Sequence, residues 1–190
     1  IIALCCNIIV VSGNCFNYTR AGNINITLLT PYLISSIPLA FIGGSLSINK
    51  IFFEILLFVI LSLAGVLLLL KFRSFDDKNE VYKKTPKIIS ILVGGSIGFI
   101  SGIVGIGGGI FLSPILLLLN AAKVKHIATT ASLFILINSI AGLSGQFTKN
   151  FVFDEIHDYW PLFLIVFIGG QIGNFLNIKI FPVRLLALVT

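Results

Sequence analysis

With 190 residues, of which 57% are hydrophobic and only 11% charged, the chain does not fit a soluble domain, which usually carries about 25% charge. The mean hydropathy of +1.08 indicates a membrane protein. The net charge of +6 gathers in short segments between apolar runs, so it reports membrane topology and not nucleic-acid binding. We therefore expect an all-α, multi-pass protein whose partner is the lipid bilayer, in the plasma membrane.

The first half of the chain contains three apolar segments that we expect to be membrane helices. Residues 3–12 form the end of one crossing, residues 28–47 form the next, and residues 52–70 form the third. Residues 17–27 are expected to join the first two. The polar segment that follows, residues 71–87, holds six Lys and Arg against three acidic residues, so the positive-inside rule places it in the cytoplasm.

This basic segment divides the chain into two related halves. Residues 72–87 are the expected linker, between a partial first repeat at residues 1–71 and a second repeat at residues 88–190. Two segments, beginning at Phe41 and Phe167, both start with F-I-G-G and continue to K-I-F-x-x-x-L-L. The topology places them in opposite orientations, and such inverted repeats are typical of secondary transporters.

The second half begins with a long uncharged run at residues 88–122. Its 35 residues would span roughly 52 Å as one helix, which is too long for one crossing and short for two. The basic cluster at residues 123–126 should lie on the cytoplasmic side again. We therefore expect a re-entrant or tightly bent pair of helices. Residues 127–147 then cross outward, an acidic loop lies outside at residues 149–158, and residues 159–178 return.

The ends of the chain suggest a fragment. It begins with Ile, contains no Met, and its last apolar run, from residue 181, is too short to span a bilayer. We expect truncation at both ends, with the glycine-rich segment of the first repeat and the end of the last helix absent. Gly94, Gly98 and Gly102 have the spacing of close helix packing, and we expect them, with Asn138, to face the absent segment.

The stretch S-G-I-V-G-I-G-G-G-I-F-L-S-P, residues 101–114, marks the expected break. Gly and Pro are the poorest residues for a helix interior, and three consecutive glycines exceed what helix packing needs. Non-helical backbone at membrane depth is tolerated only inside protein or beside a watery cavity, so a break there is a site hypothesis. A new short helix should begin at Ile110, and the free N–H groups at its start suit an anion.

The candidate substrate-binding residues are the glycines of the break and nearby polar side chains. They are Gly105, Gly107, Gly108, Gly109, Ser113, Thr129, Thr130, Ser132 and Asn138. The hydroxyl groups on the next helix have two interpretations, because they can bind substrate or satisfy neighbouring backbone. Asn138 and its neighbour Ser139 can likewise form an interhelical hydrogen bond instead.

Two stretches in this region resemble a known family. They are GGSIGFISGIVGIGGGIFLSPILLLL and the following HIATTASLFILINSIAG, which look like the second signature region of the sulfite exporter TauE/SafE family. The F-I-G-G segments resemble later helices of each half in that family. The resemblance implies a polytopic permease that moves a small anion such as sulfite, a sulfonate or a related organic anion.

We therefore predict a secondary anion transporter with no catalytic residue, metal or cofactor, and leave open whether it forms a homo-oligomer. The alternatives are a membrane-embedded enzyme and a non-transporting membrane subunit. An enzyme would need ionisable groups at membrane depth, and the spans are almost free of them. Cys5 and Cys6 are the available nucleophiles, and the sequence places no base near them.

Overall fold

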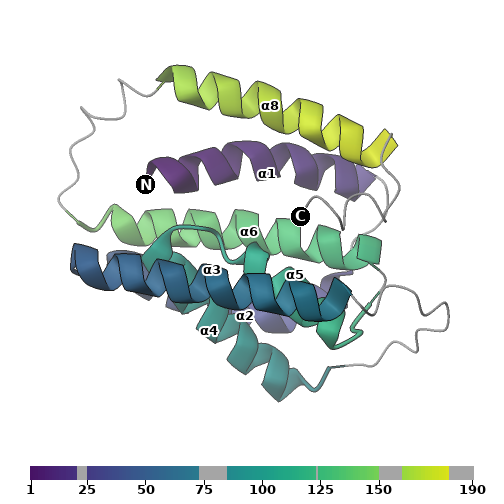
Figure 1. The fold of residues 1–190 in the computed structure, drawn as a ribbon, viewed down its shortest axis with the longest axis horizontal. Coiled ribbons are helices and arrows are strands. Elements are labelled where there is room, and N and C mark those ends of the chain that lie inside the picture. The colour runs from purple at the N-terminus through teal and green to yellow at the C-terminus, as the bar shows by residue number, and fades with distance from the viewer. Residues whose placement is uncertain (21–24, 73–84, 123, 150–159, 180–190) are drawn as a thin grey trace.

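The structure, a computed structural model, describes residues 1–20, 25–72, 85–122, 124–149 and 160–179, and its regular elements are all helices (Figure 1). They are α1 (Ile2–Arg20), α2 (Ile26–Ser45), α3 (Lys50–Phe72), α4 (Lys87–Val104), α5 (Gly109–Leu118), α6 (Val124–Gln146) and α8 (Trp160–Lys179). Most of the expected linker and outer loop, and the last apolar run, lie outside the described residues.

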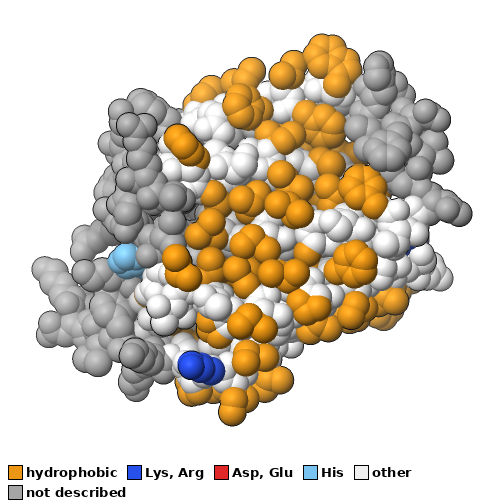
Figure 2. Space-filling model, turned by 180° about the vertical axis from the view of Figure 1, so that it is seen from behind, with side chains coloured by type: hydrophobic (Ala, Val, Ile, Leu, Met, Phe, Trp, Pro, Cys, Tyr) orange, Lys and Arg blue, Asp and Glu red, His pale blue; other side chains and the backbone are white. Residues whose placement is uncertain are grey.

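Helices long and apolar enough to cross a membrane are present among the described residues. Within the described residues, α2, α4 and residues 126–146 of α6 are long and apolar enough to cross a bilayer. Large hydrophobic side chains point outward from the peripheral helices, such as Phe58 of α3 and Ile165 of α8, which are 73% and 67% exposed. Figure 2 shows hydrophobic side chains spread across the described part of one face. Such a surface suits lipid, so the predicted all-α, multi-pass membrane fold is confirmed.

Close contacts between small residues fix the relative directions of three helices. The α4 glycines Gly94 and Gly102 lie against Tyr32 and Ala40 of α2, in the same order along both helices. Near its carboxyl end, α6 meets the corresponding end of α2, where Gly145 lies against the Phe41 carbonyl. Helices α2, α4 and α6 therefore run in the same direction. Since α4 and α6 begin at the same end, the α4–α5 unit leaves that end and returns to it, as the sequence predicted.

The glycines of α4 have a different neighbour from the one expected. A Cβ atom placed on Gly98 would lie 2.5 Å from the Ser36 carbonyl oxygen, and one on Gly94 or Gly102 would overlap α2 backbone as well. The packing interpretation is thus confirmed, and the expectation that these residues face an absent segment is wrong. Asn138, 1% exposed, is also enclosed by described residues. Glycine at these positions allows the two backbones to approach closely.

Several helix boundaries differ from those predicted. Helix α1 continues to Arg20, into the expected loop, and α2 begins at Ile26 because the Asn25 side chain caps it, accepting from the Leu28 N–H at 3.1 Å. Pro114 lies inside α5 and does not close the break. Helix α5 thus continues through this proline, although proline lacks the N–H for one helical hydrogen bond.

The two F-I-G-G segments occupy different positions in their helices. Residues 41–44 form the carboxyl end of α2, whereas residues 167–170 lie in the middle of α8. Helix α8 runs opposite to α6 (Figure 1), and α2 runs parallel to α6, so α2 and α8 run in opposite directions. This direction agrees with an inverted repeat, but the unequal positions leave the repeat itself a prediction.

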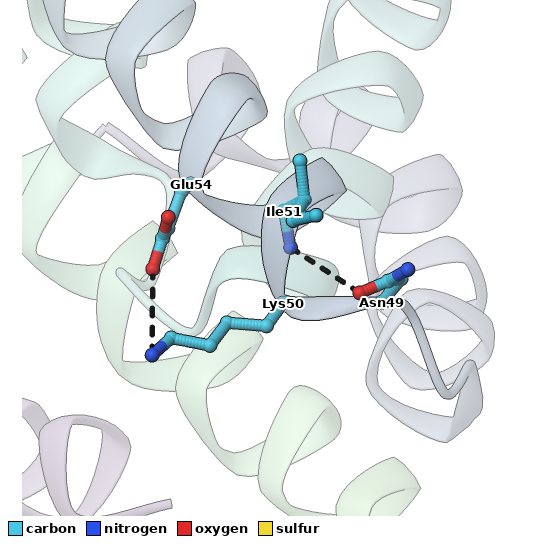
Figure 3. A network of polar contacts seen from close by, with 4 residues as sticks. All are labelled: Asn49, Lys50, Ile51 and Glu54. Carbon is cyan, nitrogen blue, oxygen red and sulfur yellow. Dashed lines mark hydrogen bonds and ion pairs between the residues drawn. The ribbon is translucent and has the colours of Figure 1, made fainter.

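Helix α3 starts at the end of the bundle where α2 finishes. The Asn49 side chain accepts from the Ile51 N–H at 3.4 Å, and Lys50 pairs with Glu54 at 3.8 Å (Figure 3). Both charged side chains are well exposed, so this pair contributes little stability. Nearby, the Lys149 ammonium donates to the Leu46 carbonyl and links the carboxyl ends of α2 and α6. Partial burial lowers the pKa of Lys149 from its usual value.

The helix directions predict a labelling pattern in a Cys-free background. Cysteine at Lys87 and cysteine at His126 should react from the same side of the membrane, which the positive-inside rule makes the cytoplasm. Cysteine at Lys149 should react from the opposite side. The measurement is modification of each single-Cys variant by an impermeant maleimide in oriented vesicles. Labelling of positions 87 and 126 from opposite sides would contradict the parallel arrangement of α4 and α6.

Candidate functional site

The break between α4 and α5 is a short stretch of backbone in which glycines adopt left-handed conformations. Gly105, Gly107 and Gly108 have φ angles of 79°, 78° and 76°. The Gly105 N–H donates to the Ser101 carbonyl at 2.7 Å and ends α4. Residues with a side chain rarely adopt this conformation, so the glycines are what allow the chain to reverse here.

The break lies in the middle of the bundle. A Cβ atom on Gly107 would lie 2.7 Å from both the Ser139 hydroxyl oxygen and a methyl carbon of Ile135, and one on Gly109 would lie 3.1 Å from the Ala131 carbonyl. These contacts fall near the midpoint of α6. Helix α5 has 10 residues, or roughly 15 Å, about half the thickness of a bilayer core. It therefore starts near mid-depth and returns to the end where α4 began.

The amino end of α5 carries unused backbone donors. Gly108 is its capping residue and supplies no side chain, while its carbonyl accepts from the Phe111 and Leu112 N–H groups at 3.2 and 3.3 Å. Among the described residues, none accepts from the N–H of Gly109 or Ile110. A helix start of this kind has a partial positive charge and unused donors, which together favour an anion.

Helices α4 and α6, which flank the break, carry buried polar side-chain atoms without partners. The Ser101 and Ser139 hydroxyl oxygens and the Asn138 side-chain oxygen are buried and have no hydrogen-bond partner among the described residues. The Asn138 amide does donate to the Phe134 carbonyl, at 2.9 Å. Ser139 lies against Gly107, and the Ser101 Cβ would lie 3.1 Å from a Cβ on Gly108. An unpaired buried polar group costs about 1–3 kcal/mol, so this convergence points to a ligand or to water.

The remaining candidates lie at varying distances from this point. Gly109 is the first residue of α5, and Ser113 is half-buried one turn later. Thr129 and Thr130 are buried in the second turn of α6, and the Thr130 hydroxyl lacks a partner among the described residues. Thr130 lies two turns, or roughly 12 Å, along α6 from Asn138. Ser132 is half-buried and lies about 200° around the helix from Thr130.

The structure therefore places the break glycines against Ser101 of α4 and against residues 131–139 of α6. Sequence reasoning missed two residues at the break. Ser101 could have been found as the polar residue one turn before Gly105, the first glycine of the break. Asn7 of α1, whose amide donates to the Ile106 carbonyl at 3.0 Å, has no sequence signal because 99 positions separate the two residues.

The site contains neutral groups. The uncharged run at residues 88–122 supplies the break, and the nearest hydrophobic side chains include Ile97, Phe134 and Ile135. Across the part of the chain that the structure describes, no three His, Cys, Asp or Glu side chains are grouped to hold a metal ion. The arrangement can thus orient dipoles toward a small ligand in a surrounding of low dielectric constant.

Comparison with known proteins places these features in a family. The family model described as Sulfite exporter TauE/SafE matches residues 1–190. A probable membrane transporter protein of Sinorhizobium fredii is 30% identical over 176 residues, which cover 90% of this chain and 69% of that protein. A probable membrane transporter protein of Methanocaldococcus jannaschii is also 30% identical, over 179 residues, which cover 90% of this chain and 66% of that protein. No solved structure matches significantly.

Proposed function

The chain belongs to the sulfite exporter TauE/SafE family of membrane proteins, and from this premise we propose that it carries a substrate site of a secondary transporter for a small anion, such as sulfite or a sulfonate. The observation that carries the proposal is the unused amino end of α5 at mid-depth, with unpartnered polar side chains of α4 and α6 beside it.

The chemistry of these groups favours an anion over a cation. The N–H groups of Gly109 and Ile110 are donors, and the hydroxyl groups of Ser101 and Ser139 can donate. The positive end of the α5 dipole attracts negative charge and repels a cation. An oxyanion with several acceptor oxygens can use these donors together. Because the donors are neutral, they bind it without the strong attraction of a buried counter-ion, which favours release.

Transport also requires the site to open, because the present packing is tight. Ile135 and Ser139 lie close to Gly107, and Ile97 and Phe134 lie close to Gly108. In our proposal the break and α6 move apart to admit the anion. The second repeat contributes this site, and an inverted first repeat, including residues 1–71, contributes its counterpart. Residues 72–87 are then the cytoplasmic linker, and the protein acts in the plasma membrane.

Alanine at Ser101 or Ser139 tests the site. Each substitution should weaken sulfite binding roughly tenfold, because it removes one donor to a charged ligand. The same substitution should leave the melting temperature unchanged or raise it, since the lost hydroxyl has no partner among the described residues. The measurements are the KM of sulfite uptake by the protein in liposomes and its thermal unfolding in detergent.

Matched controls lie on the same two helices. The Ser96 and Ser144 hydroxyls are exposed and donate to the carbonyl one turn earlier, both at 2.8 Å. Ser96→Ala and Ser144→Ala should therefore leave the KM unchanged. A KM unaffected by Ser101→Ala and Ser139→Ala, with sulfite, ethanesulfonate and acetate all tested, would move the anion site away from the break. Absence of any uptake by the wild type would favour the non-transporting or enzymatic alternative.

A further inference from the structure

Helix α1 reaches the break through one polar side chain. The Asn7 side-chain N–H donates to the Ile106 carbonyl at 3.0 Å. Leu4, one turn earlier, lies 3.6 Å from the position of a Cβ on Gly105. Asn7 is half-buried, and its amide joins two segments 99 positions apart. It therefore bonds directly to the backbone of the break.

This hydrogen bond fixes the orientation of one peptide plane. In a trans peptide the carbonyl and the following N–H point in opposite directions. With the Ile106 carbonyl turned toward Asn7, the Gly107 N–H must point away from Asn7. No described residue accepts from that N–H. The bond thus keeps a carbonyl oxygen, which would repel an anion, away from the side on which the Gly107 donor is presented.

Because Gly107 follows Ile106, the peptide between them needs a hydrogen-bond partner to fix its orientation. A flip of the 106–107 peptide changes ψ of Ile106 and φ of Gly107, and glycine adopts positive and negative φ with similar ease. Gly107 has a φ of 78° in the observed orientation. The backbone alone therefore holds this peptide weakly, and a partner for the Ile106 carbonyl decides which way it faces.

We propose that Asn7 is a positioning residue for the anion site: it holds the Ile106 carbonyl toward α1 and so presents the Gly107 N–H to the substrate. The inference rests on the proposed function, because it assumes an anion at the break. It assigns to α1 a part in substrate affinity, in addition to packing against α6 and α8.

The test compares two substitutions of Asn7 with a matched change on the same helix. Asn7→Leu keeps a similar size and removes the donor, so the KM for sulfite should rise roughly tenfold while the maximal rate changes less than about twofold. Asn7→Gln keeps a donor and should recover most of the affinity. Asn14→Leu removes an α1 amide that makes no hydrogen bond to the break, and it should leave the KM unchanged.

Amide hydrogen exchange of residues 105–110 supplies an independent measurement. Asn7→Leu should accelerate exchange there, and Asn7→Gln should not. If the wild type transports sulfite and Asn7→Leu alters neither the KM nor the exchange, the positioning role is overturned. A lower maximal rate and yield with an unchanged KM would also overturn it, because that pattern indicates a structural role. If the wild type transports no anion but exchange responds as expected, Asn7 does orient the break and the proposed function fails.

Discussion

Replacement of Gly108 by alanine is expected to abolish transport while the protein still inserts into the membrane. Gly108 has a φ of 76°, which alanine rarely adopts. Its added Cβ would also lie 2.9 Å from a methyl carbon of Ile97 and 3.1 Å from the Phe134 ring and the Ser101 Cβ. The backbone must therefore change at the residue that caps α5, and the donors at the start of α5 would turn away from the anion.

The measurement is sulfite uptake in liposomes that contain equal amounts of folded protein. Gly65→Ala in α3 is the matched control, since nothing lies within 4 Å of a Cβ at that position. The control should transport as the wild type does. Gly108→Asp is a poorer test of the anion site, because strain and charge would act together. Wild-type uptake by Gly108→Ala would show that the observed conformation of the break is not required for transport.

Replacement of Gly102 by leucine is expected to prevent stable assembly of the bundle. A Cβ at this position would overlap the Ala40 carbonyl and lie 2.9 Å from the Gly44 nitrogen, both of which are backbone atoms of α2. Backbone cannot move aside as a flexible side chain can, so α2 and α4 must separate. Since Gly142 of α6 also packs near Gly102, the separation would disturb three helices. Overpacking of a core commonly costs about 1–3 kcal/mol, and we expect a loss at or above the upper end of that range.

Folded yield in detergent and the melting temperature measure this effect. Gly173→Leu in α8 provides the control, since a Cβ there meets nothing within 4 Å, and it should leave both values close to those of the wild type. A normal yield and melting temperature for Gly102→Leu would mean that α2 and α4 are not in the close contact described. That result would also remove the basis for their parallel direction.

Much of the architecture could be predicted because it depends on local composition. The apolar run at residues 28–47 predicts a helix close to the observed α2, and the consecutive glycines predict the break at Gly107 and Gly108. Helix ends were predicted less well. Asn25 starts α2 by capping it, and α5 continues through Pro114, although proline lacks the N–H for one helical hydrogen bond.

The polar groups of the site were only partly predictable. Asn138 stays a prediction that rests on its cost in the middle of a span, whereas the positions of Ser101 and Ser139 beside the break follow from the way α4 and α6 face it. Gly102 illustrates the same limit. Its spacing from Gly98 indicates close packing, but spacing does not identify α2 as the partner.

The sequence by itself thus determined that the chain enters a bilayer as helices and that one helix breaks among glycines. Both follow from local properties, namely the transfer of apolar side chains out of water and the backbone freedom of residues that lack a Cβ. Only the tertiary structure decided which groups meet at the break. The bond from Asn7 to the Ile106 carbonyl depends on the rotation and depth of a helix 99 positions away, and these are set by packing against α6 and α8.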